Sequence, residues 1–348
     1  MRILVSADPE IPVPPRTYGG IERIVDSLVR ALRASGHEVG LIAHPQSTCP
    51  SDATFGWPGA SSQSAADTAR NLACLWRAVN AFRPEILHSY SRLAYLIPHL
   101  RGARPLVMSY QREPTPRTVG LMSRLAAPGT LTFTGCSEYI AMRGRLAGGH
   151  WQAIPNFVDP NQLTFSPVVP ADAPLVFLSR VETTKGADWA IEIARRCGQR
   201  LVIAGNHATD GSEGDYWKNK IAPMIGRDGI EYVGPVDDAQ KRVLLGQALA
   251  MLVPIQWEEP FGIVFAEALS CGTPVISCPR GALPEIVREG REGFLIRSIE
   301  EGCDAVGRVG TIDRAACRLR AETAFSVDAV VAQYVALYRS LLDRSAAR

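Results

Sequence analysis

Two glutamates, Glu259 and Glu267, stand eight positions apart around a glycine that precedes a predicted helix. A helix that begins near Gly262 leaves the N–H groups of its first turn without partners, and these groups together with the helix dipole attract an anion. Glu267 lies inside this helix with its side chain tilted back toward the first turn. A carboxylate beside an anion is favourable where it accepts hydrogen bonds, and ribose hydroxyls are suitable donors. The pattern therefore predicts a site for a ligand that carries both phosphate and sugar hydroxyl groups.

A second loop supplies cations. Arg180 and Lys185 lie in a loop that follows a predicted strand and precedes a predicted helix. Ligands of open α/β sheets bind at the carboxyl ends of the strands, so this loop and the glutamate segment are both candidates. Two cations there can neutralise a diphosphate, although two surface cations of a solvated loop would give the same sequence.

A third loop contains Gly19 and Gly20, at the entry to a predicted helix. Paired glycines let backbone N–H groups approach a phosphate, but the same pair also occurs in ordinary loops. No G-x-G-x-x-G sequence follows the first predicted strand, which argues against a nicotinamide-dependent dehydrogenase.

Short apolar runs alternate with amphipathic helical stretches along the whole chain, and this alternation predicts parallel sheets with crossover helices. In the first half the predicted strands are 2–6, 38–43, 86–88, 106–109, 132–136 and 152–154, with a helix at 21–35. In the second half they are 175–178, 201–204, 230–232, 250–253 and 274–277, with helices at 187–196, 239–249, 264–271 and 283–289. We therefore predict an α/β fold of two doubly wound domains.

A length of 348 residues exceeds what one core usually supports, so two domains are expected. The turn-rich segment 155–160 suits a linker. We place the first domain at 1–165, the second at 166–325, and an amphipathic helix at 326–348.

Composition limits the class of protein. The chain has no apolar run near the roughly 20 residues of a membrane span, and it does not begin like a secretory signal. Its eight cysteines are scattered without metal-ligand spacing, as in a reduced, cytoplasmic protein. We therefore expect a cytoplasmic location and thiols that form no disulfides.

The charge is unevenly distributed. Residues 1–165 contain 16 arginines and 11 acidic residues and no lysine, whereas the rest of the chain has an acidic excess. This half could favour an anionic acceptor or weak contact with membrane headgroups, or it could simply have an arginine-rich solvated face. No basic stripe is interleaved with aromatic residues, so nucleic acid is not an expected partner.

Taken together, these features resemble the family 4 retaining glycosyltransferases of the group 1 type. The resemblance rests on the two glutamates with Pro-Phe-Gly-Ile-Val between them and on four further motifs in the same order. Those motifs lie at 19–22, 180–186, 154–159 and 272–276. The resemblance covers essentially the whole chain. It implies the GT-B fold, in which two Rossmann-like domains face each other across a cleft and the C-terminal helix crosses back to pack on the first domain.

The resemblance also implies roles for individual residues. Gly20, with Gly19 beside it, would contact the donor phosphate, and Arg180 and Lys185 would neutralise the leaving diphosphate. Glu267 would bind the ribose and Glu259 the transferred hexose. Backbone groups at four consecutive positions would hold sugar hydroxyls and phosphate: Phe261, Gly262, Ile263 and Val264.

Other implied positions are less specific. The family places a histidine near the reacting carbon, usually in an H-x-H sequence, and here His88 is followed by Tyr90 instead of a second histidine. A buried structural histidine is the alternative for His88. The base would contact the loop that contains Val233 and Pro235, and Gly205 would lie beneath the donor.

The implied activity is retaining transfer of a hexose-type sugar from a UDP- or GDP-sugar to a hydroxyl acceptor, which is a small molecule, a glycan or a lipid-linked intermediate. Arg112 and Arg117 are the candidate acceptor contacts, with a solvated loop as the alternative. No D-x-D-like clamp is well placed, so we predict no required metal and no cofactor. The alternatives are a phosphorylase or epimerase of the same fold, and a non-catalytic sugar-nucleotide binding protein.

Overall fold

The computed structural model describes residues 1–16 and 19–346, which divide into two compact units. The first unit contains Met1–Asn156 and the last helix, α12 (Val327–Ala346), and the second unit is Phe157–Ser326. The division falls at residue 156 and not at 165, because Arg318 of the second unit donates to the carbonyls of Pro160 (3.0 Å) and Leu163 (2.9 Å). Of the predicted terminal helix 326–348, the last two residues lie outside the described part of the chain.

The described residues of the first unit form a parallel sheet of seven strands in the order β3-β2-β1-β4-β5-β6-β7. Its strands are β1 (Arg2–Ser6), β2 (Glu38–Ala43), β3 (Ala53–Gly56), β4 (Ile86–Ser89), β5 (Leu106–Tyr110), β6 (Leu131–Gly135) and β7 (His150–Ala153). All but β3 were predicted from the sequence, within two residues at each end. β3 lies at the sheet edge and alternates between half-buried and exposed residues, so it lacks the continuous apolar run of a central strand.

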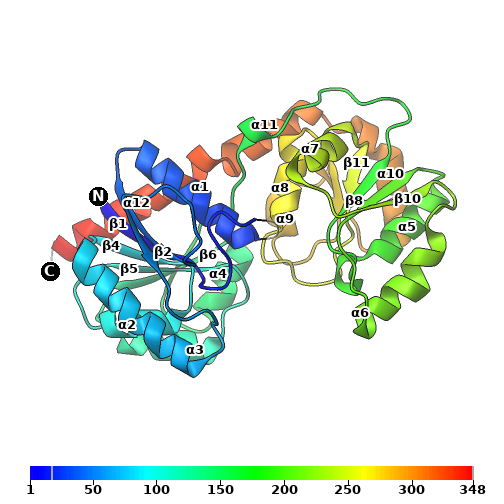
Figure 1. The fold of residues 1–348 in the computed structure, drawn as a ribbon. Coiled ribbons are helices and arrows are strands. Elements are labelled where there is room, and N and C mark those ends of the chain that lie inside the picture. The colour runs from blue at the N-terminus through cyan, green and yellow to red at the C-terminus, as the bar shows by residue number, and fades with distance from the viewer. Residues whose placement is uncertain (17–18, 347–348) are drawn as a thin grey trace. The chain divides into compact units, whose positions relative to one another are not determined.

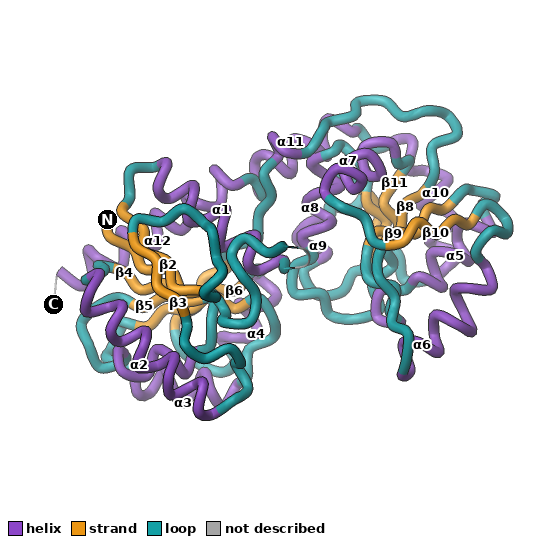
Figure 2. Tube along the Cα trace, in the orientation of Figure 1, coloured by secondary structure: helices purple, strands orange, loops and turns teal. Residues whose placement is uncertain are grey.

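Helices cover both faces of this sheet (Figures 1 and 2). They are α1 (Gly20–Ala34), α2 (Ala65–Phe82), α3 (Pro116–Leu125), α4 (Glu138–Arg145) and α12. α1 buries Ile24, Val25 and Leu28 on one stripe, as its helical spacing predicts. α12 lies beside α1 although nearly the whole chain separates them (Figure 1).

The second unit repeats this scheme with a parallel sheet of six strands in the order β10-β9-β8-β11-β12-β13. The strands are β8 (Leu175–Leu178), β9 (Leu201–Ala204), β10 (Ile230–Gly234), β11 (Ala250–Leu252), β12 (Val275–Ser277) and β13 (Gly293–Leu295). The helices are α5 (Ala187–Arg196), α6 (Gly211–Tyr216), α7 (Asp238–Gln247), α8 (Ile263–Ser270), α9 (Leu283–Ile286), α10 (Ile299–Arg308) and α11 (Arg314–Ala324). Only β13 was not predicted among these strands; it is three residues long and begins with a glycine.

In each sheet the chain starts at a central strand, moves outward on one side, and then returns to build the other side. The strand order reverses between β1 and β4 in the first unit and between β8 and β11 in the second. Loops that leave the carboxyl ends of two such strands diverge, and the space between them is where open α/β sheets bind ligands. The fold therefore directs attention to the loops after β8 and β11, and after β1 and β4.

Candidate active site

Lys185 and Glu259 meet at the point where the strand order of the second sheet reverses. Lys185 ends the short 3-10 turn Thr183–Lys185 after β8, and Glu259 lies in the loop between β11 and α8. The Lys185 Nζ is 2.6 Å from Glu259 Oε2, and the two side chains are only 10% and 11% exposed. Both charges are thus largely removed from water, and the attraction between them offsets the cost of burying each one.

Trp257 contacts both members of this ion pair. Its indole Nε1–H donates a hydrogen bond of 2.9 Å to Glu259 Oε2, and the Lys185 Nζ lies 4.7 Å from the ring centroid. The indole is 38% exposed, so this contact is at the protein surface and not in the core. The sequence did not indicate Trp257; its position two residues before Glu259 was the only signal.

The backbone of Glu259 is fixed by the turn that follows β12. The N–H of Ala282 donates to the carbonyl of Glu259 (2.9 Å), and the N–H of Gly281 donates to the Glu258 carboxylate (2.6 Å). Gly281 has a φ of +56°, and a Cβ at this residue would lie 2.2 Å from the Glu259 carbonyl oxygen. Only glycine allows this close approach, which holds the glutamate in place.

The Lys185 loop is held from two sides. The Thr184 carbonyl accepts a hydrogen bond of 2.8 Å from the N–H of Gln256, which ties this loop to the loop of Glu259. The N–H of Thr183 donates to Glu213 of α6 at 2.7 Å. The Lys185 ammonium is therefore presented by a segment with little freedom to shift.

Glu267 forms a second ion pair, with Lys241. The Lys241 Nζ is 2.5 Å from Glu267 Oε1 and 3.2 Å from Asp238 Oδ1, and the pair joins α7 to α8. Burial lowers the pKa of Lys241, but the two carboxylates outweigh this effect and the pKa is raised overall. Glu267 is 16% exposed and so remains within reach of a ligand. Lys241 is a further residue that the sequence did not indicate.

The first turn of α8 begins at Gly262, as the sequence predicted. Gly262 has a φ of +84° and precedes the helix, so the N–H groups of Ile263 and Val264 belong to its first turn. The side chain of Phe261 is buried edge-on against Phe325, with 5.6 Å between the ring centroids. Of Phe261, only the backbone is therefore available to a ligand.

Arg180 does not join the Lys185 pair. Its guanidinium is about half exposed and lies 2.6 Å from Glu182 in the same loop. Arg180 nevertheless lies at the same carboxyl edge of the sheet as Lys185, since both follow β8, which ends at Leu178.

The remaining predicted donor contacts lie at the ends of β9 and β10. Gly205 packs so closely that a Cβ there would be 1.9 Å from the Ser179 carbonyl oxygen, so packing alone requires this glycine. Val233 and Pro235 are exposed, and the register of β10 on β9 shifts between Tyr232 and Gly234. They are accessible, as a base-binding loop would need to be.

In the first unit, α1 begins at Gly20, and Gly19 is the residue before it. Thr17 and Tyr18 of the same loop lie outside the described residues. Glu22 in the first turn of α1 is buried, and burial raises the pKa of its carboxyl. The glycines thus stand at a helix start, as predicted.

The two candidate acceptor residues differ in their surroundings. Burial raises the pKa of Asp8, which follows β1, and the guanidinium groups of Arg112 and Arg92 offset only part of this effect. Arg112 therefore belongs to a cluster of charges at the carboxyl edge of the first sheet. Arg117 is exposed in the first turn of α3, on the face opposite the buried Val119.

The prediction that His88 contacts the sugar is wrong for this structure, because His88 has no exposed surface. Its Nδ1 lies 2.6 Å from the Tyr338 hydroxyl and its Nε2 lies 2.7 Å from the Ser109 hydroxyl. The rings of Tyr90 and Tyr334 pack against it at 4.6 and 5.0 Å. Burial lowers the pKa of His88 to about 3, so the ring is neutral and joins α12 to the sheet.

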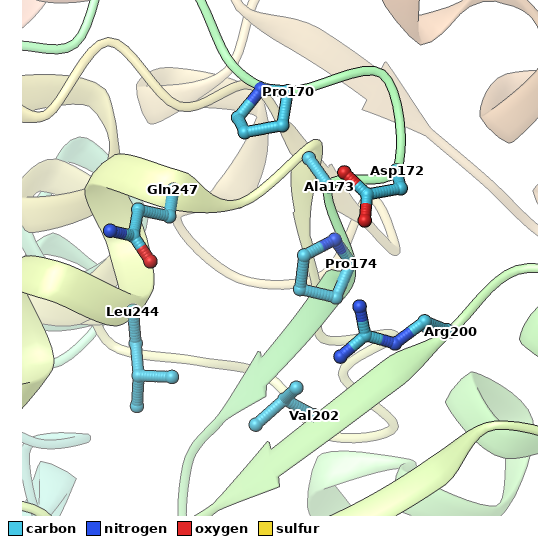
Figure 3. Close-up of a pocket in the computed structure, with 8 residues that line it drawn as sticks. All are labelled: Pro170, Asp172, Ala173, Pro174, Arg200, Val202, Leu244 and Gln247. Atoms are coloured by element: carbon cyan, nitrogen blue, oxygen red, sulfur yellow. The ribbon is translucent and has the colours of Figure 1, made fainter.

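A separate hollow of about 290 Å³ lies at the other end of the second sheet (Figure 3). Pro174 and Arg200, which line it, stand immediately before β8 and β9. Parallel sheets place their ligand sites at the carboxyl ends of the strands, and none of the predicted site residues lines this hollow. We therefore assign it no role in the chemistry.

In 1–16 and 19–346, no three His, Cys, Asp or Glu side chains are grouped as metal ligands. Across the same ranges, no helix has both the length and the apolar character that a membrane span requires.

Both units of the chain match models of known protein families. Residues 166–301 match the family model described as glycosyl transferases group 1, and residues 18–162 match the model described as glycosyltransferase family 4. D-inositol 3-phosphate glycosyltransferase of Mycolicibacterium smegmatis is 30% identical over 195 residues, which are 52% of this chain and 45% of that protein. The matched region thus spans about half the length of this relative.

Solved structures resemble the whole chain. The structure of a glycosyltransferase involved in avilamycin A biosynthesis has a TM-score of 0.74 at 25% identity and covers 98% of both chains. The structure of HepE from Anabaena in complex with UDP and glucose has a TM-score of 0.71 at 20% identity, covering 98% of this chain and 100% of the other. At that identity the second likeness concerns the fold alone.

The two family models together match most of the chain, one in each unit. The chain therefore belongs to the group 1, family 4 glycosyltransferases, and its two Rossmann-like units form their GT-B fold.

The Lys185–Glu259 pair makes a prediction about stability. Replacing Lys185→Met leaves a nearly dry carboxylate without its cation, and we expect the free energy of unfolding to fall by about 2 to 4 kcal/mol. Adding Glu259→Gln should recover a large part of the loss. Urea unfolding followed by circular dichroism measures both, with the exposed Lys218→Met as the matched control. A loss that the second substitution deepens would contradict the pairing.

The buried His88 makes a prediction about pH. The unfolded state takes up a proton near pH 6.5, whereas folded His88 resists protonation down to about pH 3. The contribution of His88 to the free energy of unfolding should therefore be fully present above pH 6.5. Below that pH it should fall by about 1.4 kcal/mol per pH unit. Urea unfolding between pH 7 and 4 should show a smaller decline in His88→Gln. Equal slopes for the two proteins would show that His88 is not held neutral.

Proposed function

We propose that this protein is a retaining glycosyltransferase, which moves a hexose from a nucleoside diphosphate sugar to a hydroxyl group of an acceptor. The observation that carries the proposal is the meeting of Lys185 and Glu259, beside the first turn of α8, where the strand order of the second sheet reverses. A cation, a hydroxyl-binding carboxylate and unpaired N–H groups at one place match a sugar joined to a diphosphate. Family membership supports the same activity.

In the proposed reaction, the bond between the sugar C1 and the diphosphate oxygen breaks, and the departing oxygen gains negative charge. Lys185, Arg180 and the first-turn N–H groups of α8 stabilise this charge, which is electrostatic catalysis. The acceptor hydroxyl then bonds to C1 on the face that the diphosphate leaves, and its proton passes to the departing diphosphate. The configuration at C1 is therefore retained.

The donor would be held at several points. Glu267 accepts hydrogen bonds from the ribose, and the exposed loop of Val233 and Pro235 contacts the base. When a diphosphate attracts Lys185, Glu259 becomes available to the hydroxyls of the hexose. UDP and GDP both meet these requirements.

The proposal needs no metal ion, because cations of the chain and helix N–H groups supply the positive charge. Arg112, whose charge acts on the half-buried Asp8, would contact the acceptor, which is a small molecule, a glycan or a lipid-linked intermediate. All eight cysteines are free thiols, in keeping with a reducing, cytoplasmic setting.

The first test is a thermal-shift panel of nucleoside diphosphates and their hexose conjugates in the presence of EDTA. A ligand at 100 times its dissociation constant stabilises the folded state by about 2.7 kcal/mol, so one diphosphate should raise the melting temperature clearly. The matching sugar nucleotide is then incubated with acceptors and the product examined for an unchanged anomeric configuration. Hydrolysis or phosphorolysis without any transfer would favour an epimerase or phosphorylase, and binding without turnover would favour a binding protein.

A second test removes the ribose contact. Glu267→Ala should lower kcat/KM at least about a hundredfold, because a half-buried carboxylate that accepts ribose hydrogen bonds is lost. Glu300→Ala, on the exposed surface of α10, is the control and should leave kcat/KM unchanged. Near-normal turnover in a folded Glu267→Ala protein would remove Glu267 from the site.

A further inference from the structure

Trp257 touches both partners of the Lys185–Glu259 pair through different parts of its side chain. Its N–H is committed to the Glu259 oxygen that also binds Lys185, and its ring face lies toward the Lys185 ammonium. Packing does not account for this arrangement, because the indole is 38% exposed, whereas Trp57 and Trp151 are 2% and 9% exposed. The contact is therefore polar in character and placed at the edge of the site.

On the proposed function, binding of a donor changes the hydrogen-bond partners of the Glu259 carboxylate. In the structure described here, Glu259 Oε2 accepts from two donors, the Lys185 ammonium and the Trp257 N–H. A diphosphate competes for Lys185. Of the two donors, only the indole N–H then still binds the carboxylate, which has little access to water. A carboxylate without a hydrogen-bond donor in such a place is costly, and without the indole N–H it would turn away from this position.

We propose that Trp257 is a positioning residue, whose N–H keeps the Glu259 carboxylate correctly oriented for the hexose while Lys185 binds the diphosphate. This inference rests on the proposed function and extends it to a residue outside the two-glutamate motif. Trp257 acts through Glu259, so it affects recognition of the sugar and not of the nucleotide. A nucleoside diphosphate lacks the hexose and should bind independently of the indole N–H.

The experiment compares Trp257→Phe, which keeps a ring face but removes the N–H, with Trp257→His, which restores a ring N–H. Trp76→Phe, at an exposed tryptophan of α2 in the first unit, is the matched control. For each variant we would measure the dissociation constant of the diphosphate found in the panel, and kcat and KM for its hexose donor. Melting temperatures establish that each variant is folded.

We expect Trp257→Phe to bind the diphosphate within twofold of the wild type and to lose about tenfold in kcat/KM for the hexose donor. Trp257→His should be several-fold more active than Trp257→Phe. In a Glu259→Gln background, Trp257→Phe should cause no further loss, because a residue that acts through Glu259 has nothing left to position.

Three results would overturn the inference: unchanged kcat/KM in Trp257→Phe, an equal loss of diphosphate affinity and turnover, or full additivity with Glu259→Gln. The last two are the signs of a general structural role. A wild-type protein that binds no nucleoside diphosphate and transfers no sugar would instead refute the proposed function itself, and the two failures are thereby distinguishable.

Discussion

An ammonium and a carboxylate that are both about nine-tenths buried offset each other's cost of leaving water. Several contacts of the second unit hold these two side chains together. The turn at Gly281 fixes the backbone of Glu259, and the bond from Gln256 to Thr184 fixes the distance between the two loops that supply the charges. The parallel sheet places both loops at one edge, and the reversal of strand order opens the space between them.

Such a pair is also well suited to binding a ligand. A structural ion pair in a dry core has nothing to exchange with, whereas this pair borders on solvent through the partly exposed Trp257. The energy that a diphosphate gains from Lys185 is reduced by what the protein loses when the pair separates. Glu267 and Lys241 form a second pair of this kind on neighbouring helices, so two of the carboxylates assigned to the ligand already carry a cation partner.

The sequence was sufficient for most strands and for the positions of the loops, because apolar runs between helical stretches leave few alternatives for a parallel sheet. It predicted that Lys185 and Glu259 line a site, but not that they contact each other, since 74 residues separate them and only the sheet topology brings them together. Trp257 and Lys241 gave no periodic signal at all. His88 was misassigned because a strand end next to a helix from the far end of the chain buries it, and no local pattern reveals such packing.

The last helix has a consequence for how the molecule is made. α12 belongs to the first unit, where its tyrosines meet His88, yet it follows the whole second unit in the chain. A ribosome therefore releases every residue of the second unit before it supplies the piece that completes the first. Domains generally fold in order of synthesis, but here the earlier one stays unfinished, with the His88 face of its sheet uncovered, until the later one is complete. The unit that begins the chain is thus the one that is completed last.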